Sequence, residues 1–318
     1  MSRAGAAGVL AVLAGASQAP PSEAPKKTAA VSVGYVLVPV VVTDDRGRAL
    51  AGLSQKDFTV VVEGRPVSID FFSASDDAPV SFTILLDGSG SMGLAGKMEG
   101  ARSALRDLVA QARPGDDFSL HVFAEGAVRE LVPFTGDGSR ILAAAGSVKP
   151  WGKTAFFDAL ARMPDRTLLG RNGARAIVLL TDGMDNASVV TRERLEELLQ
   201  GVDVPVYPIG LRPSPLTPAG GERDVDVELL SRIAFETGGR LAVTDEEKEL
   251  PAAVRAIEKD LRSQYLLGFT PTGSGPVKYR DISIVIGRRI GAIRTRSGYR
   301  GTEPPWQGAP ARKKGSSK

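Results

Sequence analysis

Between Val80 and Ser263 the chain alternates strand patterns and helix patterns, and this alternation restricts the fold more than any other feature. Runs of apolar and β-branched residues, such as VSFTILLD (80–87) and ARAIVLLTD (174–182), alternate with segments whose apolar residues recur at helical spacing. The second run is apolar on both faces, as expected for a central strand covered on both sides. We therefore predict an α/β fold with a doubly wound, mostly parallel, Rossmann-like sheet.

The segments on either side of this region have β patterns without helical spacing. The candidate strands are residues 31–42, a hairpin over 58–72, and residues 265–271, 279–286 and 290–296. Each flank alone offers only about three strands, which is marginal for independent stability. We therefore expect residues 31–78 and 264–300 to form one small β-sandwich-like accessory domain, into which the α/β domain, residues 79–263, is inserted.

The ends of the chain have the composition of processing and linker segments. Arg3 precedes a small and apolar run that ends in an A-x-A-like site at Ala14-Gly15-Ala16, so residues 1–16 predict a secretory signal peptide, with a disordered Ala-rich leader as the alternative. Residues 17–30 are rich in proline and predict a linker, and residues 301–318 predict a disordered basic tail. No other segment approaches the ~20 apolar residues of a membrane helix. We expect an exported protein, periplasmic or extracellular.

Composition excludes some site chemistries and leaves others open. The chain has no cysteine, which excludes disulfides, zinc–thiolate sites and thiol catalysis. The formal net charge is only +3, but residues 278–300 hold seven Lys/Arg against one Asp. We expect this run to be a solvated strand face, with an acidic partner as the alternative. Lys97 and Lys153 are likewise expected to be solvated, and the alternative is that they add positive potential for an acidic ligand.

The segment LDGSGSMG (86–93), between a strand and a helix pattern, has two chemical interpretations. Its glycines match the G-x-G-x-x-G turn of dinucleotide-binding domains, with Glu125 as the candidate ribose-binding acid. Its oxygens, on Asp87, Ser89 and Ser91, suit a hard divalent cation. The nucleotide interpretation is the weaker one, because Asp87 would place a carboxylate where a pyrophosphate meets the helix N-terminus.

Two enzymatic interpretations of the same segment are also weak. A serine hydrolase would use Ser89 or Ser91, but the elbow motif needs Gly where Asp87 stands. The chain's single histidine, His121, lies within a strand pattern and precedes the candidate acid Asp182, so we expect it to be a packed strand residue. An aspartyl phosphotransferase usually has a second acid two residues after the first, and this chain has Ser89 there.

The metal interpretation is supported by residues far from the segment. A doubly wound sheet gathers the C-terminal ends of its strands into one crevice. Asp87 ends the first strand, Asp182 ends the central strand, and Thr154 lies in a Gly-containing loop that can reach the same edge. With Ser89 and Ser91 this set has two carboxylates and three hydroxyls, which suits Mg²⁺.

Together, Asp87-x-Ser89-x-Ser91, Thr154 and Thr181-Asp182-Gly183 resemble the metal-ion-dependent adhesion site of a von Willebrand factor type A domain. The flanks are similar to those of exported bacterial proteins that carry this domain. The resemblance implies that Asp87 reaches the metal mostly through water, and that the other ligands bind directly or through water. Mg²⁺ is the expected cofactor, with Mn²⁺ or Ca²⁺ as alternatives.

The charge of the predicted site indicates its function. Asp87 and Asp182 contribute about −2 against an ion of +2, so the ion can still accept an Asp or Glu carboxylate from a protein partner. No general base is evident, and we expect an adhesion or assembly module rather than an enzyme. The alternative is a structural cell-envelope protein whose metal site is only structural and whose basic β-domain is the interaction surface.

Two further expectations concern single segments. Residues 211–224, rich in Pro and Gly, form a long strand-to-helix connection at the predicted site edge, and are either a specificity loop or an idle insertion. Pro208 lacks the N–H of a ladder bond, which puts the pairing of its strand in doubt.

Overall fold

The computed structural model describes residues 35–74, 78–211, 226–244, 249–271, 276–302 and 304. All of them belong to one unit, Gly34–Lys318. The predicted signal peptide, the linker, most of the loop over 211–224 and most of the basic tail lie outside the described residues. Within the described residues, no helix is long and apolar enough to cross a membrane.

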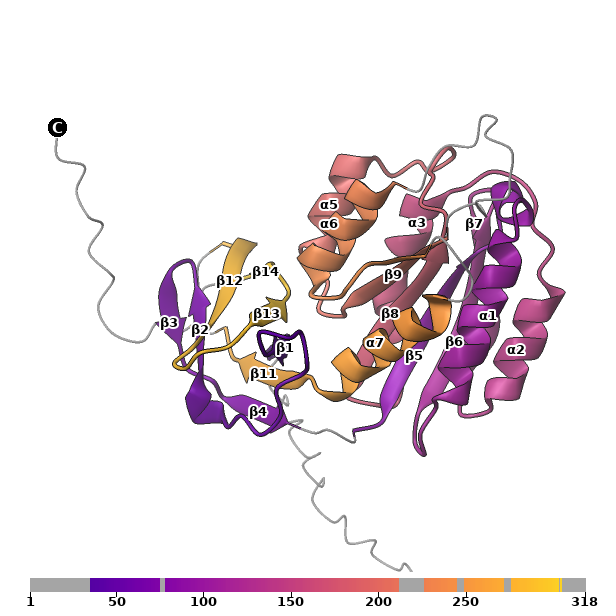
Figure 1. Cartoon of the computed structure of the whole chain (residues 1–318). Helices are drawn as coiled ribbons and strands as arrows, with labels where there is room; N and C mark the ends of the chain where they lie inside the picture. The colour runs from indigo at the N-terminus through magenta and orange to yellow at the C-terminus, as the bar shows by residue number, and fades with distance from the viewer. Residues whose placement is uncertain are drawn as a thin grey trace, which may run out of the picture. The chain divides into compact units, whose positions relative to one another are not determined.

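The α/β region is built on a six-stranded sheet with the order β10-β9-β8-β5-β6-β7 (Figure 1). Its strands are β5 (Val80–Asp87), β6 (Asp117–Ala124), β7 (Ala127–Thr135), β8 (Ala174–Thr181), β9 (Val206–Leu211) and β10 (Ala242–Thr244). Strands β10, β9, β8, β5 and β6 pair in parallel, and β7 pairs with β6 antiparallel. The prediction of a mostly parallel sheet is therefore confirmed.

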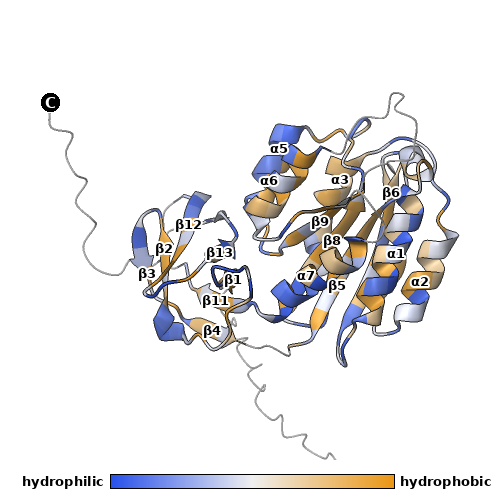
Figure 2. Ribbon diagram, in the orientation of Figure 1, coloured by the Kyte–Doolittle hydropathy of each residue, from blue (hydrophilic) through white to orange (hydrophobic). Residues whose placement is uncertain are grey.

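Helices cover both faces of this sheet. They are α1 (Lys97–Ala110), α2 (Gly138–Ser147), α3 (Phe156–Leu160), α4 (Met163–Thr167), α5 (Arg192–Leu199), α6 (Val227–Thr237) and α7 (Leu250–Arg262). Apolar residues of α1, α2 and α7 share one core with the sheet, and those of α3, α4, α5 and α6 share the core on the other face. Figure 2 shows hydrophobic strands at the centre and hydrophilic residues on the helices. The sheet is thus doubly wound, as predicted.

Local sequence signals set several helix ends. The Thr191 hydroxyl accepts a hydrogen bond from the N–H of Arg194 and caps α5, as predicted. Asp226 caps α6 in the same way, and α6 ends at Gly238, whose φ of 82° is the left-handed conformation that glycine adopts readily.

The flanks form two four-stranded antiparallel sheets with the orders β13-β1-β11-β4 and β14-β12-β2-β3. Their strands are β1 (Val36–Thr43), β2 (Phe58–Val62), β3 (Arg65–Val67), β4 (Phe71–Ala74), β11 (Tyr265–Phe269), β12 (Lys278–Ile286), β13 (Ala292–Thr295) and β14 (Gly298–Gly301). Each sheet contains strands from both flanks, and the two sheets share one hydrophobic core. This confirms that the flanks join around the α/β region.

Three details of the fold differ from the sequence expectations. The predicted hairpin over 58–72 ends at β3, because β4 leaves it and pairs with β11 in the other sheet. The short elements α4, β10 and β14 were not predicted from the sequence. Pro208 does not disturb its strand, since β9 pairs with β8 through it, with Leu179 opposite Pro208.

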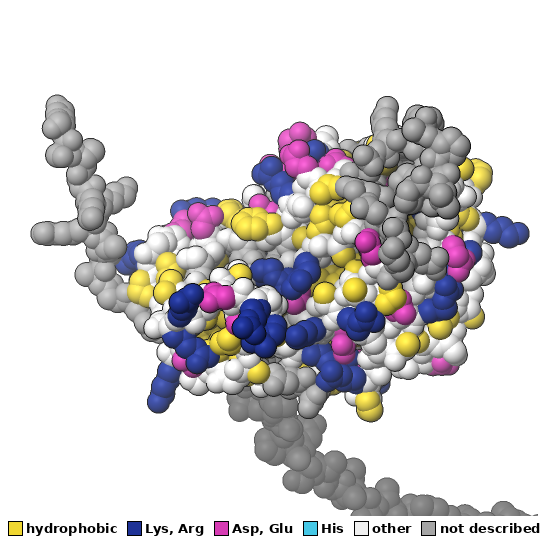
Figure 3. All heavy atoms as spheres, in the orientation of Figure 1, with side chains coloured by type: hydrophobic (Ala, Val, Ile, Leu, Met, Phe, Trp, Pro, Cys, Tyr) yellow, Lys and Arg dark blue, Asp and Glu magenta, His cyan; other side chains and the backbone are white. Residues whose placement is uncertain are grey.

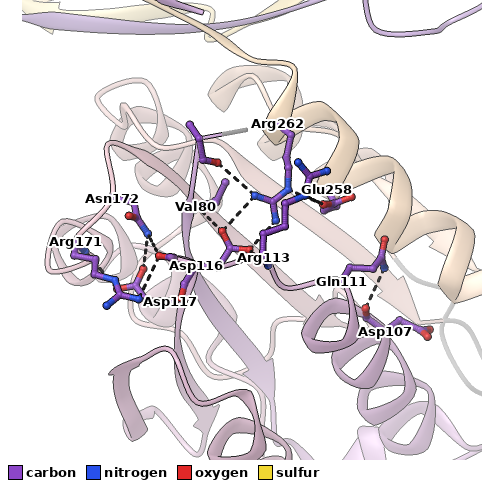
Figure 4. A network of polar contacts seen from close by, with 12 residues as sticks. Val80, Asp107, Gln111, Arg113, Asp116, Asp117, Arg171, Asn172, Glu258 and Arg262 are labelled. Atoms are coloured by element: carbon purple, nitrogen blue, oxygen red, sulfur yellow. Dashed lines mark hydrogen bonds and ion pairs between the residues drawn. The ribbon is translucent and has the colours of Figure 1, made fainter. Parts of the chain in front are cut away.

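A buried ion-pair network lies at the edge of the sheet where the parallel strands β5 and β6 begin. Arg262, the last residue of α7, faces Asp116, which immediately precedes β6 (Figure 4). Asp116 also accepts hydrogen bonds from the N–H groups of Val80 and Arg113. The network therefore fixes the start of β5, where the chain enters the α/β region, to the end of α7, where it leaves.

Candidate metal centre

The strand order brings two distant aspartates to one edge of the sheet. From β5 the chain continues to β6 on one side, and later returns to β8 on the other side. Such a reversal of strand order leaves a crevice at the C-terminal ends of the strands. Asp87 is the last residue of β5, and Asp182 directly follows β8, its parallel neighbour. The predicted pairing of these two residues at one rim is what the fold produces.

Asp87 is buried, and hydrogen bonds hold both of its carboxylate oxygens. Oδ1 accepts from the N–H of Ser89 at 2.9 Å, and Oδ2 accepts from the hydroxyl of Thr181 at 2.7 Å. The hydroxyls of Ser89 and Ser91 lie 3.2 Å apart. Asp87, Ser89 and Ser91 therefore form one cluster of oxygens, as the alternate spacing predicts.

Thr181 has a positioning role that the sequence did not identify. Its hydroxyl donates to Asp87 and accepts from the N–H of Gly183 at 2.9 Å. Thr181 thus links the end of β5 to the turn that follows Asp182. A signal was present, because Thr181 directly precedes Asp182 at the end of a strand expected to neighbour the strand of Asp87.

Close approach explains the two glycines between the oxygen-bearing residues. A Cβ atom at Gly88 would lie 2.7 Å from Cγ1 of Val122, and one at Gly90 would lie 3.3 Å from the carbonyl oxygen of Gly152. Neither glycine has a positive φ. Gly88 therefore serves close packing against Val122, and a side chain at Gly90 would be a tight fit; neither position needs glycine for a left-handed turn.

The loop of Thr154 is bound to the same rim through its backbone. The N–H of Gly90 donates to the carbonyl of Gly152, and the N–H of Trp151 donates to the carbonyl of Gly88, both at 2.9 Å. The N–H of Thr154 donates to Oδ1 of Asn186, from the loop that follows Asp182. The Thr154 loop is therefore hydrogen-bonded both to the segment after β5 and to the loop after β8.

Lys97 is buried beside Asp182, and the expectation that this lysine is solvated was wrong. Its Nζ lies 3.1 Å from Oδ2 of Asp182, and the two side chains are 3% and 2% exposed. The sequence could not show this, because the short 3-10 helix over Gly90–Gly93 and the left-handed Gly96 set the direction in which α1 begins. Lys153, in contrast, is exposed as expected.

Burial and charge raise the pKa of Asp87 to about 6. Burial is the main cause, because it disfavours the ionised carboxylate, and the negative charge of Asp182 adds to it. The hydrogen bonds from Ser89 and Thr181 act in the opposite direction. A cation at this rim would compensate two carboxylates that are held together out of water.

The donor set has the chemistry of a hard-cation site. Two carboxylates and three hydroxyls are oxygen ligands of the kind that Mg²⁺ accepts, and a positive charge, the ammonium of Lys97, already lies against one of the carboxylates. Among the described residues no group of three or more Asp, Glu, His or Cys side chains is close enough to hold a metal. The candidate site therefore depends on hydroxyls as well as acids.

The residues required by the other interpretations lie in less suitable places. His121 is buried within β6, where it pairs with Leu85 of β5 and Glu130 of β7. It lies two residues before Phe123, the residue of β6 that pairs with Asp87. The side chain of Glu125 accepts a hydrogen bond from the N–H of Lys153 and so braces the Thr154 loop. The last four residues of GSGSMG, Gly90–Gly93, form a 3-10 helix, and α1 begins only at Lys97.

A comparison with protein families gives one match, which covers part of the chain. Residues 82–184 match the sequence model of the von Willebrand factor type A domain, and all five candidate ligands lie within this range. A comparison with curated proteins gives no match.

Several solved structures are similar to the chain. An aerotolerance-related membrane protein from Bacteroides fragilis is 22% identical, with 57% of this chain and 98% of that chain covered and a TM-score of 0.45. A von Willebrand factor type A protein from Catenulispora acidiphila is 14% identical, with 86% and 75% covered and a TM-score of 0.49. A mutant of the PilB minor pilin from Streptococcus sanguinis is 11% identical, with 73% and 88% covered and a TM-score of 0.46.

Proposed function

We propose that this chain binds Mg²⁺ at the rim formed by Asp87, Ser89, Ser91, Thr154 and Asp182, and through the ion binds an acidic side chain of a protein partner. The observation that carries the proposal is the buried Asp87 carboxylate, hydrogen-bonded to Ser89 and Thr181 at the same sheet edge as Asp182. Mn²⁺ or Ca²⁺ could replace Mg²⁺, since both take oxygen ligands.

Each group of ligands has a distinct task in this proposal. Thr181 and the N–H of Ser89 use both oxygens of Asp87, so Asp87 acts on the ion through water. The hydroxyls of Ser89 and Ser91 are neutral oxygen ligands, so they add no charge to the site. With two carboxylates in the set, a bound divalent ion would supply a coordination position that is still attractive to a partner's carboxylate.

Exposed apolar side chains near the candidate ligands support a protein partner. Trp151 is 69% exposed, and its backbone N–H is bonded to Gly88 of the metal motif. Leu94 follows the 3-10 helix that contains Ser91, Val189 lies in the loop after Asp182, and both are exposed. A large exposed aromatic side chain beside a charged centre is typical of an interface hot spot.

The proposal includes no catalytic step. Asp87 would have to act as a base or nucleophile, but hydrogen bonds hold both of its oxygens. His121 is buried within β6, and the pKa of its imidazole is lowered, mainly by burial.

We propose a binding module that works outside the cytoplasm, for which the signal-like residues 1–16 are the support. Export is tested by the N-terminal mass of the mature protein, which should lack this segment.

Isothermal titration with Mg²⁺ tests the metal part of the proposal. The native chain should bind one ion, and Asp87→Asn and Asp182→Asn should each weaken binding at least tenfold. Glu228→Gln is the matched control, because it also removes a carboxylate but from an exposed position on α6. Equal Mg²⁺ affinity in all four proteins would exclude this site.

Retention of envelope proteins on the immobilised chain tests the partner part. A partner that coordinates the ion should be retained in Mg²⁺, released by chelator, and absent from the Asp182→Asn column. Its retention should also fall when its own Asp and Glu residues are replaced by Asn and Gln. Retention that survives both chelation and the Asp182 substitution would favour the structural alternative.

The structural alternative requires a free basic surface, and the ion pairs of the β-sandwich weigh against it. Figure 3 shows Lys and Arg side chains over the sandwich on the face drawn. However, four of the seven basic residues in 278–300 pair with acids: Lys278 and Arg280 with Glu63, Arg289 with Asp45, and Arg294 with Asp260. Much of the positive charge in this run is therefore compensated within the chain.

A further inference from the structure

Lys97 is the first residue of α1 and lies where two effects oppose a lysine. Its side chain is almost fully buried, and an ammonium loses its hydration on burial. The N-terminus of a helix carries a partial positive charge, which also disfavours a cation there. A favourable interaction must offset both effects, and the carboxylate of Asp182, 3.1 Å from Nζ, supplies one.

The backbone ties Lys97 directly to the metal motif. The N–H of Leu94 donates to the carbonyl of Ser91 at 3.2 Å, and the N–H of Lys97 donates to the carbonyl of Leu94 at 3.1 Å. Two successive turns thus connect a candidate ligand to the lysine. The position of the ammonium is therefore set by the same short segment that sets Ser89 and Ser91.

Charge counting shows what the ammonium does to the site. Asp87 and Asp182 contribute about −2, and Lys97 reduces this to about −1 before any ion binds. With Mg²⁺ the total becomes about +1, and a partner's carboxylate would bring it to zero. Lys97 and a divalent cation therefore compete for the negative charge of Asp182, at a separation where charges interact strongly in a buried setting.

We propose that Lys97 is a tethered cation that keeps the site assembled without metal and lowers its affinity for divalent ions. The ammonium compensates Asp182 in the metal-free protein, and metal binding requires that this compensation be given up or shared. This inference rests on the metal half of the proposed function and extends it, because it makes the native affinity a balance between a resident and an incoming cation.

The test compares Mg²⁺ binding by the native chain, Lys97→Met and Lys97→Arg in isothermal titration. Methionine keeps much of the length of the lysine without its charge, and we expect it to tighten Mg²⁺ binding about tenfold or more. Arginine keeps the charge, so the Mg²⁺ affinity of Lys97→Arg should stay closer to native than that of Lys97→Met. Lys153→Gln removes an exposed charge from the neighbouring Thr154 loop and should change the affinity less than Lys97→Met.

A second measurement protects the test against a folding defect. Without metal, Lys97→Met should have a lower melting temperature than the native chain, because Asp182 loses its counter-ion. Added Mg²⁺ should raise the melting temperature of Lys97→Met by more than it raises that of the native chain. A variant that fails to show this larger Mg²⁺-dependent rise contradicts the proposal even if its titration cannot be measured.

The outcomes separate this inference from the proposed function. Native and Lys97→Met proteins that bind Mg²⁺ equally, or a variant that binds more weakly, would overturn the role of Lys97 and leave the metal site intact. Binding by Lys97→Met alone would support the tethered cation and overturn metal binding by the native chain. Binding by neither protein would overturn both.

Discussion

Arg262 and Asp116 form a buried ion pair, with Nη2 of the arginine 2.7 Å from Oδ2 of the aspartate. A second bond joins Nη1 to Oδ1, so the contact is bidentate. Burial raises the pKa of Asp116, but the hydrogen bonds from Arg262 and from the N–H groups of Arg113 and Val80 lower it overall. The pair links the two segments in which the chain passes between the sandwich and the α/β region, the start of β5 and the end of α7.

Removing one partner of this pair should be severely destabilising. Arg262→Met leaves Asp116 buried without its counter-ion, and we expect a loss of about 3–5 kcal/mol in the free energy of unfolding. Urea unfolding measures this loss, and Arg255→Met, an exposed arginine on the same helix, is the control that should change little. A loss below about 1 kcal/mol would mean that the ion pair does not stabilise the contact between the start of β5 and the end of α7.

The pH dependence of this effect has a definite sign. The pKa of Asp116 is lowered by folding, so its contribution to stability is present above the ordinary pKa of 3.8 and is lost as the pH falls through the folded value. The difference between Arg262→Met and the native chain should therefore be largest near neutral pH and should shrink below about pH 4.

Gly88 provides a test of close packing at the metal motif. Alanine there would place Cβ 2.7 Å from Val122, inside the core, and we expect Gly88→Ala to cost about 1–3 kcal/mol of stability. The matched control is Gly146→Ala in α2, where nothing lies within 4 Å and stability should rise by up to about 1 kcal/mol. Val122→Ala should partly rescue Gly88→Ala, and this is decided by the urea midpoints of the native chain, each of these two single variants and the double variant. Additive effects of the two substitutions would contradict the packing explanation.

The ionised carboxylate of Asp87 should lower the free energy of unfolding when no metal is bound. Folding raises its pKa from 3.8 to about 6, a difference that corresponds to about 3 kcal/mol. A raised pKa means that the stabilising contribution is present below pH 3.8 and is lost as the pH rises through about 6. Asn at this position keeps one acceptor oxygen and loses one hydrogen bond, worth about 1 kcal/mol. We expect metal-free Asp87→Asn to be about 2 kcal/mol more stable than the native chain at pH 7.5.

Two comparisons check this prediction. The stability gained by Asp87→Asn should disappear below about pH 4, where both side chains are neutral. Saturating Mg²⁺ should stabilise the native chain and leave Asp87→Asn nearly unchanged in thermal unfolding. A variant that is less stable than the native chain at pH 7.5 without metal would show that Asp87 is structural.

Much of the sheet, and the meeting of Asp87 and Asp182 at one edge of it, could be predicted from the sequence, because the strands involved have strong local patterns. The strands of Asp87 and Asp182 are long apolar runs, and parallel pairing necessarily brings their C-terminal ends to one edge. The short strands β10 and β14 depend on pairing partners distant in sequence, and nothing in their few residues indicates a strand.

The contact of Lys97 with Asp182 could not be predicted, and that of Thr181 with Asp87 was missed, for a different reason. Sequence spacing shows which strand or helix a residue belongs to, but not the direction in which its side chain leaves that element. Lys97 meets Asp182 because a 3-10 turn and a left-handed glycine precede α1, and Thr181 meets Asp87 because β5 and β8 are neighbours in register. Both contacts are consequences of the assembled fold.

Trp151 should contribute to partner binding without contributing to metal binding. Its ring is exposed, while its backbone N–H, which braces Gly88, is unaffected by substitution. We expect Trp151→Ser to weaken Mg²⁺-dependent partner retention at least tenfold, since loss of an aromatic interface anchor commonly costs about 2 kcal/mol. The Mg²⁺ affinity should stay within about twofold of native, because no candidate ligand is altered.

Leu169→Ser is the control for this prediction. Leu169 is a similarly exposed apolar residue, but it precedes the start of β8 and so lies at the opposite edge of the sheet. Equal loss of retention in both variants would indicate nonspecific adhesion of the partner to apolar surface, and would remove Trp151 from the proposed interface.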